Sequence, residues 1–265
     1  MKSQRIFLGA LLFCFFGIAL IGESQAEFLG TAPTGLLLLE KKNHPYCLFV
    51  PPDYSMEKTW AFLVLLGGSG KEPKEVVRPW LEWAKQNHFL ILVPSVIPRE
   101  GSVPTDVDRW LFEIKEEVGQ RYRINPSQIL LTGVEEGAHY AAYLGLNYPK
   151  EFSRAVLVRR AWAGPFEKLM RPVSDARKQI PFYVALDPKG RSFPAMEARA
   201  LQLEKKGYRI AFDPLKPAED FSGLQDRLLK WFLGDSEFGA KRSREKPSSK
   251  WKEKFHEIRK NVFDM

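Results

Sequence analysis

Cysteine is almost absent from this chain of 265 residues, which contains only Cys14 and Cys47. Cys14 lies in an apolar stretch near the N-terminus, and Cys47 lies in a second apolar run, residues 46–50. Once the N-terminal stretch is removed, the single remaining cysteine excludes an internal disulfide and a thiolate metal cluster. We therefore expect Cys47 to be a buried, unreactive thiol, and we expect no metal ion and no cofactor.

Histidine, the most frequent general base in enzymes, is also scarce, with four in the chain. His44 lies in a predicted hairpin, His88 begins a predicted strand, and His256 belongs to the C-terminal tail. His139 lies in a predicted helix whose geometry turns it away from a pocket mouth in most placements. We expect His139 to lie on the surface or behind a site, which leaves few candidates for a catalytic base.

Excess positive charge is missing from the body of the chain, although the net charge is +8. Residues 240–265 hold nine Lys or Arg and four acidic residues, and residues 1–26 hold two basic residues and one acidic. The body is therefore nearly neutral, and nucleic acid is not an expected partner.

Residues 1–26 have the pattern of a signal peptide. Lys2 and Arg5 precede the apolar run 6–22, and Ser24-Gln25-Ala26 suits signal peptidase. We expect cleavage before Glu27 and export to the periplasm or the medium. An uncleaved N-terminal anchor is the alternative, although the apolar run is short for a membrane span of about 20 residues.

Residues 27–238 are predicted to form one α/β domain with a mostly parallel central sheet and helices on both faces, because apolar runs alternate with helical patterns. Trp80 and Trp110 each lie among apolar residues at helical spacing, and both are expected in the core. The predicted strands are residues 36–40, 46–50, 60–66, 88–94, 128–132, 153–158, 182–186 and 208–212. The predicted helices are residues 74–87, 196–206 and 220–233, together with one that starts after Gly137. A further helix is capped by Thr105 or Asp106, and its inward face carries Val107, Trp110, Leu111, Ile114 and Val118.

The most informative stretch is residues 128–149, QILLTGVEEGAHYAAYLGLNYP. It predicts a buried strand, a turn bracketed by Gly133 and Gly137 that is too sharp for side chains at those points, and a helix with a small-residue face. A strand, a Gly-x-x-x-Gly turn and a helix form the nucleophile elbow of α/β-hydrolases. The central residue of this turn is Glu135.

Residues 121–158, RYRINPSQILLTGVEEGAHYAAYLGLNYPKEFSRAVLV, resemble the secreted polyhydroxybutyrate depolymerase, feruloyl esterase and acetylxylan esterase branch of the α/β-hydrolases. Members of that branch read roughly RY-x-ID-P-x-R-I-Y-L-T-G-x-S-x-G-G here. The resemblance implies the α/β-hydrolase fold, with Glu135 in the place of the nucleophilic serine. It also implies an oxyanion loop of Gly67, Gly68 and Ser69, joined by the backbone N–H of Glu136.

The rest of the family's triad is incomplete in this sequence. The acid position is Asp187 or Gly190, depending on the register, and we favour Asp187 as the start of a turn before Pro188. The histidine position falls in residues 213–223, DPLKPAEDFSG, which contain no histidine. A covalent hydrolase of this fold needs a base to activate the water that releases the product.

Glu135 therefore has several interpretations. It could attack a substrate once, act with Glu136 as a carboxylate pair of the glycosidase type, or fill the oxyanion hole with its own carboxylate. We expect an elbow whose chemistry has been lost, in a protein that binds a polymer, an ester or a protein partner in the old cleft. An exported ester hydrolase that uses Glu135 and a scaffold with an empty pocket are the alternatives.

Residues 239–265 form a basic tail. A polar linker precedes Trp251, Phe255, Ile258 and Val262, which predict a basic amphipathic helix within residues 250–263. It is expected to pack on the domain, to lie on an anionic surface, or to dock to a partner.

Overall fold

Eight strands form one sheet in the part of the chain that the computed structural model describes, residues 32–98, 104–215 and 221–234. The continuous apolar runs of the sequence form the strands that are buried on both faces. The strands are β1 Gly35–Lys41, β2 His44–Val50, β3 Trp60–Leu66, β4 Phe89–Pro94, β5 Ile124–Val134, β6 Arg154–Val158, β7 Phe182–Leu186 and β8 Ile210–Pro214.

The helices are α1 Pro73–Val77, α2 Leu81–Asn87, α3 Thr105–Arg121, α4 Glu136–Asn147, α5 Phe193–Lys205 and α6 Phe221–Leu233, with short 3-10 turns at Arg78–Trp80, Glu167–Leu169 and Ala176–Lys178. The prediction of a single helix over residues 74–87 is wrong, because a 3-10 turn with Pro79 near its start separates α1 from α2. Proline has no N–H to continue an α-helical ladder. The predicted caps Thr105 and Asp106 lie inside α3, and the N-cap is Pro104.

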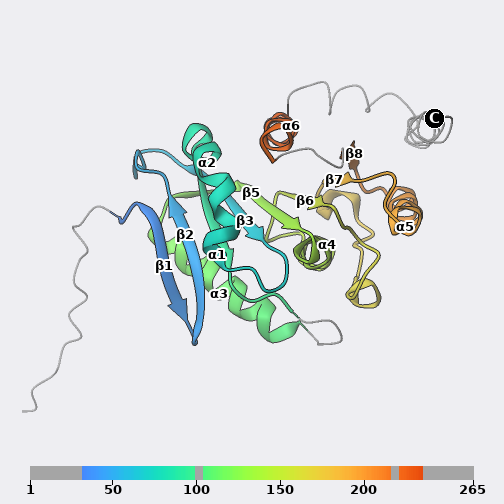
Figure 1. Cartoon of the computed structure of the whole chain (residues 1–265), viewed down its shortest axis with the longest axis horizontal. Helices are drawn as coiled ribbons and strands as arrows, with labels where there is room; N and C mark the ends of the chain where they lie inside the picture. The colour runs from blue at the N-terminus through green and yellow to red at the C-terminus, as the bar shows by residue number, and fades with distance from the viewer. Residues whose placement is uncertain (1–31, 99–103, 216–220, 235–265) are drawn as a thin grey trace, which may run out of the picture. The chain divides into compact units, whose positions relative to one another are not determined.

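The sheet has the strand order β1-β2-β4-β3-β5-β6-β7-β8 (Figure 1). The predicted hairpin is confirmed, since β1 pairs antiparallel with β2, and β2 pairs antiparallel with β4. The other neighbours are parallel. The carboxyl ends of β3, β5, β6, β7 and β8 therefore meet at one edge of the sheet, where open α/β folds bind their ligands.

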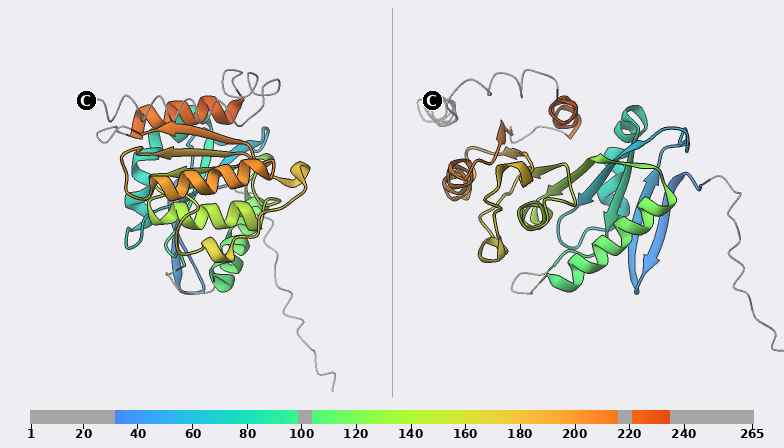
Figure 2. Two further views of the ribbon diagram at one scale, coloured as in Figure 1. Left: turned by 90° about the vertical axis from the view of Figure 1, so that its right-hand side faces the viewer. Right: turned by 180° about the vertical axis from the view of Figure 1, so that it is seen from behind.

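Helices cover both faces of the sheet, as predicted (Figures 1 and 2). One core lies under α3, α4 and α5, and the other lies under α1, α2 and α6. Trp80 and Trp110 are 1% and 4% exposed, which confirms their packing role. Cys47 is buried on β2, and this burial raises the pKa of its thiol to about 11. No helix in the described ranges is long and apolar enough to cross a bilayer.

A buried carboxylate joins α3 to α4. Asp108 on α3 is 2% exposed and accepts hydrogen bonds from the hydroxyl groups of Tyr140 (2.6 Å), Tyr143 (2.9 Å) and Tyr148 (2.9 Å). Val107, predicted to face inward, is partly buried and packs against the core. This network fixes the helix that leaves the elbow against the helix beside it.

The predicted signal peptide and the predicted tail helix lie outside the described residues, so both stay predictions.

Candidate functional site

The turn between β5 and α4 has the backbone geometry of a strained elbow. Glu135 adopts φ 57° and ψ −122°, a conformation that residues other than glycine rarely take. Its N–H donates to the Val158 carbonyl at 3.0 Å, and its carbonyl accepts from the N–H of Ala138 at 3.0 Å. The turn therefore holds residue 135 at the carboxyl ends of β5 and β6.

The two glycines around this turn are there for space, as the sequence predicts. A Cβ atom on Gly133 would lie 2.3 Å from the carbonyl oxygen of Gly137. A Cβ atom on Gly137 would lie 2.3 Å from the carbonyl oxygen of Leu66. Both distances are far below van der Waals contact, so only glycine allows α4 to start this close to β5 and to the end of β3.

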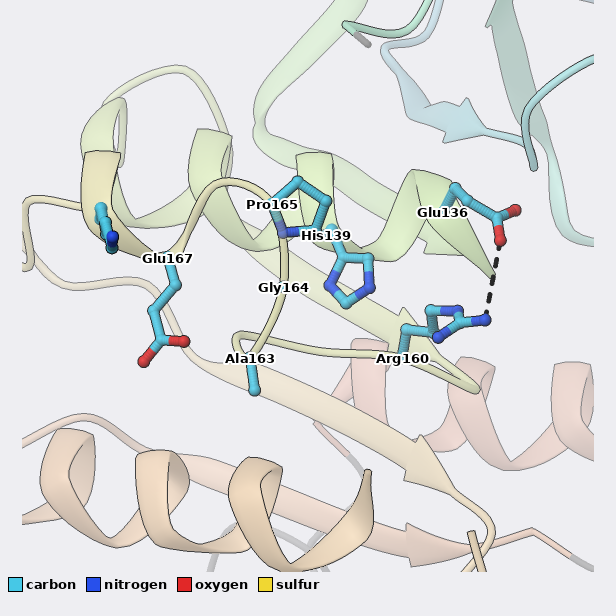
Figure 3. A pocket seen from close by; sticks show the side chains of 8 residues that line it. Glu136, His139, Arg160, Ala163, Gly164, Pro165 and Glu167 are labelled. Atoms are coloured by element: carbon cyan, nitrogen blue, oxygen red, sulfur yellow. Dashed lines mark ion pairs between the residues drawn. The ribbon is translucent and has the colours of Figure 1, made fainter. Parts of the chain in front are cut away.

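Glu135 and Glu136 lie among cations from two other loops. The ammonium group of Lys71, after β3, donates to Oε2 of Glu135 at 2.9 Å. Nη1 of Arg159, after β6, lies 3.7 Å from Oε1 of Glu135. Nη2 of Arg160 lies 3.7 Å from Oε1 of Glu136 (Figure 3). The elbow thus carries a cluster of ion pairs at the position where serine hydrolases of the α/β-hydrolase fold carry their nucleophile.

Arg159 is also strained, with φ 67°. Its N–H donates to the Ala185 carbonyl at 2.7 Å, which holds this conformation. Two non-glycine residues with positive φ, Glu135 and Arg159, therefore form an ion pair with each other. Strain of this kind persists where the surrounding structure fixes it, and it concentrates at functional sites.

The predicted oxyanion loop lies directly beside these carboxylates. Gly67 and Gly68 are buried, and Ser69 is exposed. A Cβ atom on Gly68 would meet Oε2 of Glu135 at 2.8 Å and Oε2 of Glu136 at 3.1 Å. The two carboxylates therefore occupy the space next to Gly68. The Glu135 carboxylate forms ion pairs there with the side chains of Lys71 and Arg159.

Asp187 follows β7 and is engaged in its own turn. Its Oδ1 accepts from the N–H of Lys189 at 2.9 Å, and its carbonyl accepts from the N–H of Gly190 at 3.0 Å. This geometry is the one that a turn-starting aspartate adopts. Gly190 in turn accepts from the N–H of Phe193 at 3.0 Å, which leads the chain into α5.

A further carboxylate, that of Asp213 on β8, has partners that could not be predicted from the sequence. Tyr183 donates a short hydrogen bond to its Oδ2, and Nε of Arg227 donates to the same oxygen at 2.7 Å. Burial raises the pKa of Tyr183, and the bond to Asp213 raises it further. These partners come from β7, β8 and α6, and no local sequence pattern connects them.

His139 is not a surface residue, and that part of its prediction is wrong. It is 5% exposed on α4, because the loop after β6 packs over it. Its Nδ1 lies 2.7 Å from the carbonyl oxygen of Ala161, and since a carbonyl only accepts, Nδ1 donates. A Cβ atom on Gly164 would lie 2.4 Å from the imidazole, so the glycine backbone rests on the ring.

An open pocket of about 650 Å³ lies between the start of α4 and this loop (Figure 3). Its lining carries two acids, two cations, one histidine and three small or cyclic residues. They are Glu136, His139, Arg160, Ala163, Gly164, Pro165, Glu167 and Lys168. Within the residues described, no group of three or more His, Cys, Asp or Glu is placed to hold a metal ion.

No family model matches this sequence, and neither does any curated protein. Solved structures do match. S-formylglutathione hydrolase FrmB from Staphylococcus aureus has a TM-score of 0.60 at 12% identity, over 75% of this chain and 97% of that one. A thermophilic esterase from the Planctomycetes species Thermogutta terrifontis, with butyrate bound, has a TM-score of 0.57 at 12% identity, over 77% and 96%.

A further thermostable esterase has a TM-score of 0.55 at 16% identity, and the match covers 75% of this chain but only 62% of that longer one. Identities this low establish the fold alone. Together with the strand order and the elbow, these structural matches show that this protein has the α/β-hydrolase fold.

Proposed function

We propose that this protein is a non-catalytic member of the depolymerase and esterase branch of the α/β-hydrolases, and that it binds a polymer, an ester or a protein partner at the old cleft. The observation that carries the proposal is the set of ion pairs formed by the Glu135 side chain. The elbow backbone is kept, but its central side chain is a carboxylate engaged by Lys71 and Arg159.

Turnover requires more than a nucleophile at the elbow. An acyl group on Glu135 would be an anhydride, and a base that deprotonates the attacking water would speed its release. The family places this base after the last strand, and residues 213–223 contain no histidine. His139 is buried and its Nδ1 is bonded to a backbone carbonyl. Lys71 and Arg159 also engage the Glu135 carboxylate in ion pairs, which compete with a substrate for its oxygen atoms.

An ester hydrolase that uses Glu135 is the second candidate. The strained backbone at Glu135 favours this candidate, because such strain concentrates at functional sites and a protein that only binds has no catalytic need for it. Glu136, next to it, supplies a second carboxylate in reach of Gly68.

Hydrolysis of p-nitrophenyl acetate and butyrate by the purified protein, Glu135→Ala and Glu135→Ser separates the two candidates. We expect all three to show only the uncatalysed rate. The exposed Glu116→Ala serves as a matched control for loss of one carboxylate. Activity in the parent protein and in Glu116→Ala that disappears in Glu135→Ala would make Glu135 a catalyst.

A further inference from the structure

We infer that the pocket between α4 and the loop after β6 binds a small carboxylic acid that also carries hydroxyl groups, of the size of a sugar acid. This inference rests on the binding function proposed above and specifies the chemistry of the ligand.

The carboxylate requirement comes from the cations of the pocket. Arg160 is 45% exposed, and its guanidinium lies at 3.7 Å from Glu136, which is too far for a good hydrogen bond. An exposed pair this loose contributes little, so a ligand carboxylate that accepts two parallel hydrogen bonds from Arg160 can displace Glu136. Lys168 provides a second positive charge in the same lining.

The hydroxyl requirement comes from the acids of the pocket. Glu136 and Glu167 lie on either side of His139 in Figure 3 and both line the cavity. Ionised carboxylates only accept hydrogen bonds, so a ligand must bring donors to more than one place. A simple fatty acid brings no hydrogen-bond donor for either carboxylate.

Size and lining point the same way. A volume of about 650 Å³ lies in the range of small-molecule sites, about 300–1,000 Å³. The lining residues include no Phe, Tyr or Trp and no Leu, Ile, Val or Met, so an acyl chain or an aryl group would meet only Ala163, Pro165 and the imidazole of His139 as apolar partners. Gly164 fixes the loop on the His139 ring, because any side chain at position 164 would push the loop away.

Calorimetric titration with D-galacturonate, D-gluconate, D-galactose, butyrate and L-serine tests the inference. We expect at least one of the two sugar acids to bind, with D-galactose and butyrate each at least tenfold weaker. Arg160→Ala should weaken sugar-acid binding at least tenfold, and Glu167→Gln should weaken it less. Arg177→Ala removes an exposed arginine outside the pocket and should leave binding unchanged.

The inference is overturned if neither sugar acid binds at millimolar concentration, if D-galactose binds as tightly as D-galacturonate, or if Arg160→Ala binds like the parent protein. If butyrate binds as tightly as the sugar acids, the ligand needs no hydroxyl group. If L-serine binds more tightly than the sugar acids, the pocket prefers an ammonium group. Each result overturns the inference as stated. Arg160 is exposed, so its variant is expected to unfold at the parent midpoint. Failure here leaves the ester assay, which tests the loss of catalysis, unaffected.

Discussion

At Glu135 the backbone has φ 57° and ψ −122°, where a Cβ atom is strained and glycine is not. The turn keeps this conformation through the hydrogen bonds of its own N–H and carbonyl, independently of the side chain. Strain and side-chain chemistry are therefore separable at this residue.

We predict that Glu135→Gly is more stable to urea than Glu135→Ala, by about 1 kcal/mol. Both variants lose the carboxylate, so their difference reports the strain alone. At Glu116, exposed in the middle of α3, the same pair of substitutions should have the opposite order, because alanine favours a helix over glycine by about 1 kcal/mol. Equal midpoints for the two Glu135 variants would show that the turn is not strained.

Sequence reasoning identified Glu135 and its two glycines, since an elbow is a local pattern within a few residues. It could not identify Lys71 or Arg159 as partners of Glu135. Those two residues come from loops after different strands, and only the parallel arrangement of the strands brings them together. Charged residues are frequent in loops, so nothing in their local sequence marks them.

The α3 and α4 helices are joined by polar groups as well as by apolar packing. Asp108 lies on the inward face of α3, at a position where amphipathic periodicity predicts an apolar residue. Its three tyrosine partners follow at residues 140, 143 and 148, on α4 and just beyond it. The fold of each helix could be predicted from its own spacing, but this contact between helices could not.

We expect Asp108→Ala to lower the free energy of unfolding by about 3–5 kcal/mol, because it leaves buried hydroxyl groups without their acceptor and opens a cavity. Tyr148→Phe removes one bond and should cost about 1 kcal/mol. Asp106→Ala, at an exposed position of the same helix, should change the value by less than about 1 kcal/mol. Urea denaturation checks all three. A loss from Asp108→Ala no larger than that from Asp106→Ala would contradict the structural role of the network.

Across the whole molecule, buried tyrosines couple folding to alkaline pH. Burial raises the pKa values of Tyr140, Tyr143 and Tyr183 above the ordinary value of 10.0. Above pH 10 the unfolded chain loses these phenolic protons while the folded protein keeps them. The folded state then binds more protons, and stability falls as the pH rises.

We predict that the free energy of unfolding declines between pH 10 and pH 11, by up to about 1.4 kcal/mol per pH unit for each such tyrosine. Tyr183→Phe should show a shallower decline than the parent protein, because one of these groups is removed. Urea midpoints from pH 8 to pH 11 measure both slopes. Identical slopes for the parent protein and Tyr183→Phe would exclude Tyr183 from the coupling.

The fold could be predicted for nearly the whole described chain, because alternating apolar runs and helical spacing determine the sheet and its two helical layers. The site was predictable only where it is local. Of the two positions predicted for His139, the surface one is wrong, since its burial depends on a loop after β6 that approaches closely because position 164 is glycine. Contacts set by loops from separate strands require the three-dimensional structure.

The ion pairs at the elbow also determine which evolutionary changes remain open to this protein. A serine at position 135 would stand beside Lys71 and Arg159, with no histidine in residues 213–223 and with Asp187 engaged in its own turn. A serine triad at this elbow would require changes in three separate segments: the elbow itself, the loop after β7 and the loop after β8. If the proposed binding function is right, selection at this edge of the sheet acts on recognition rather than on turnover.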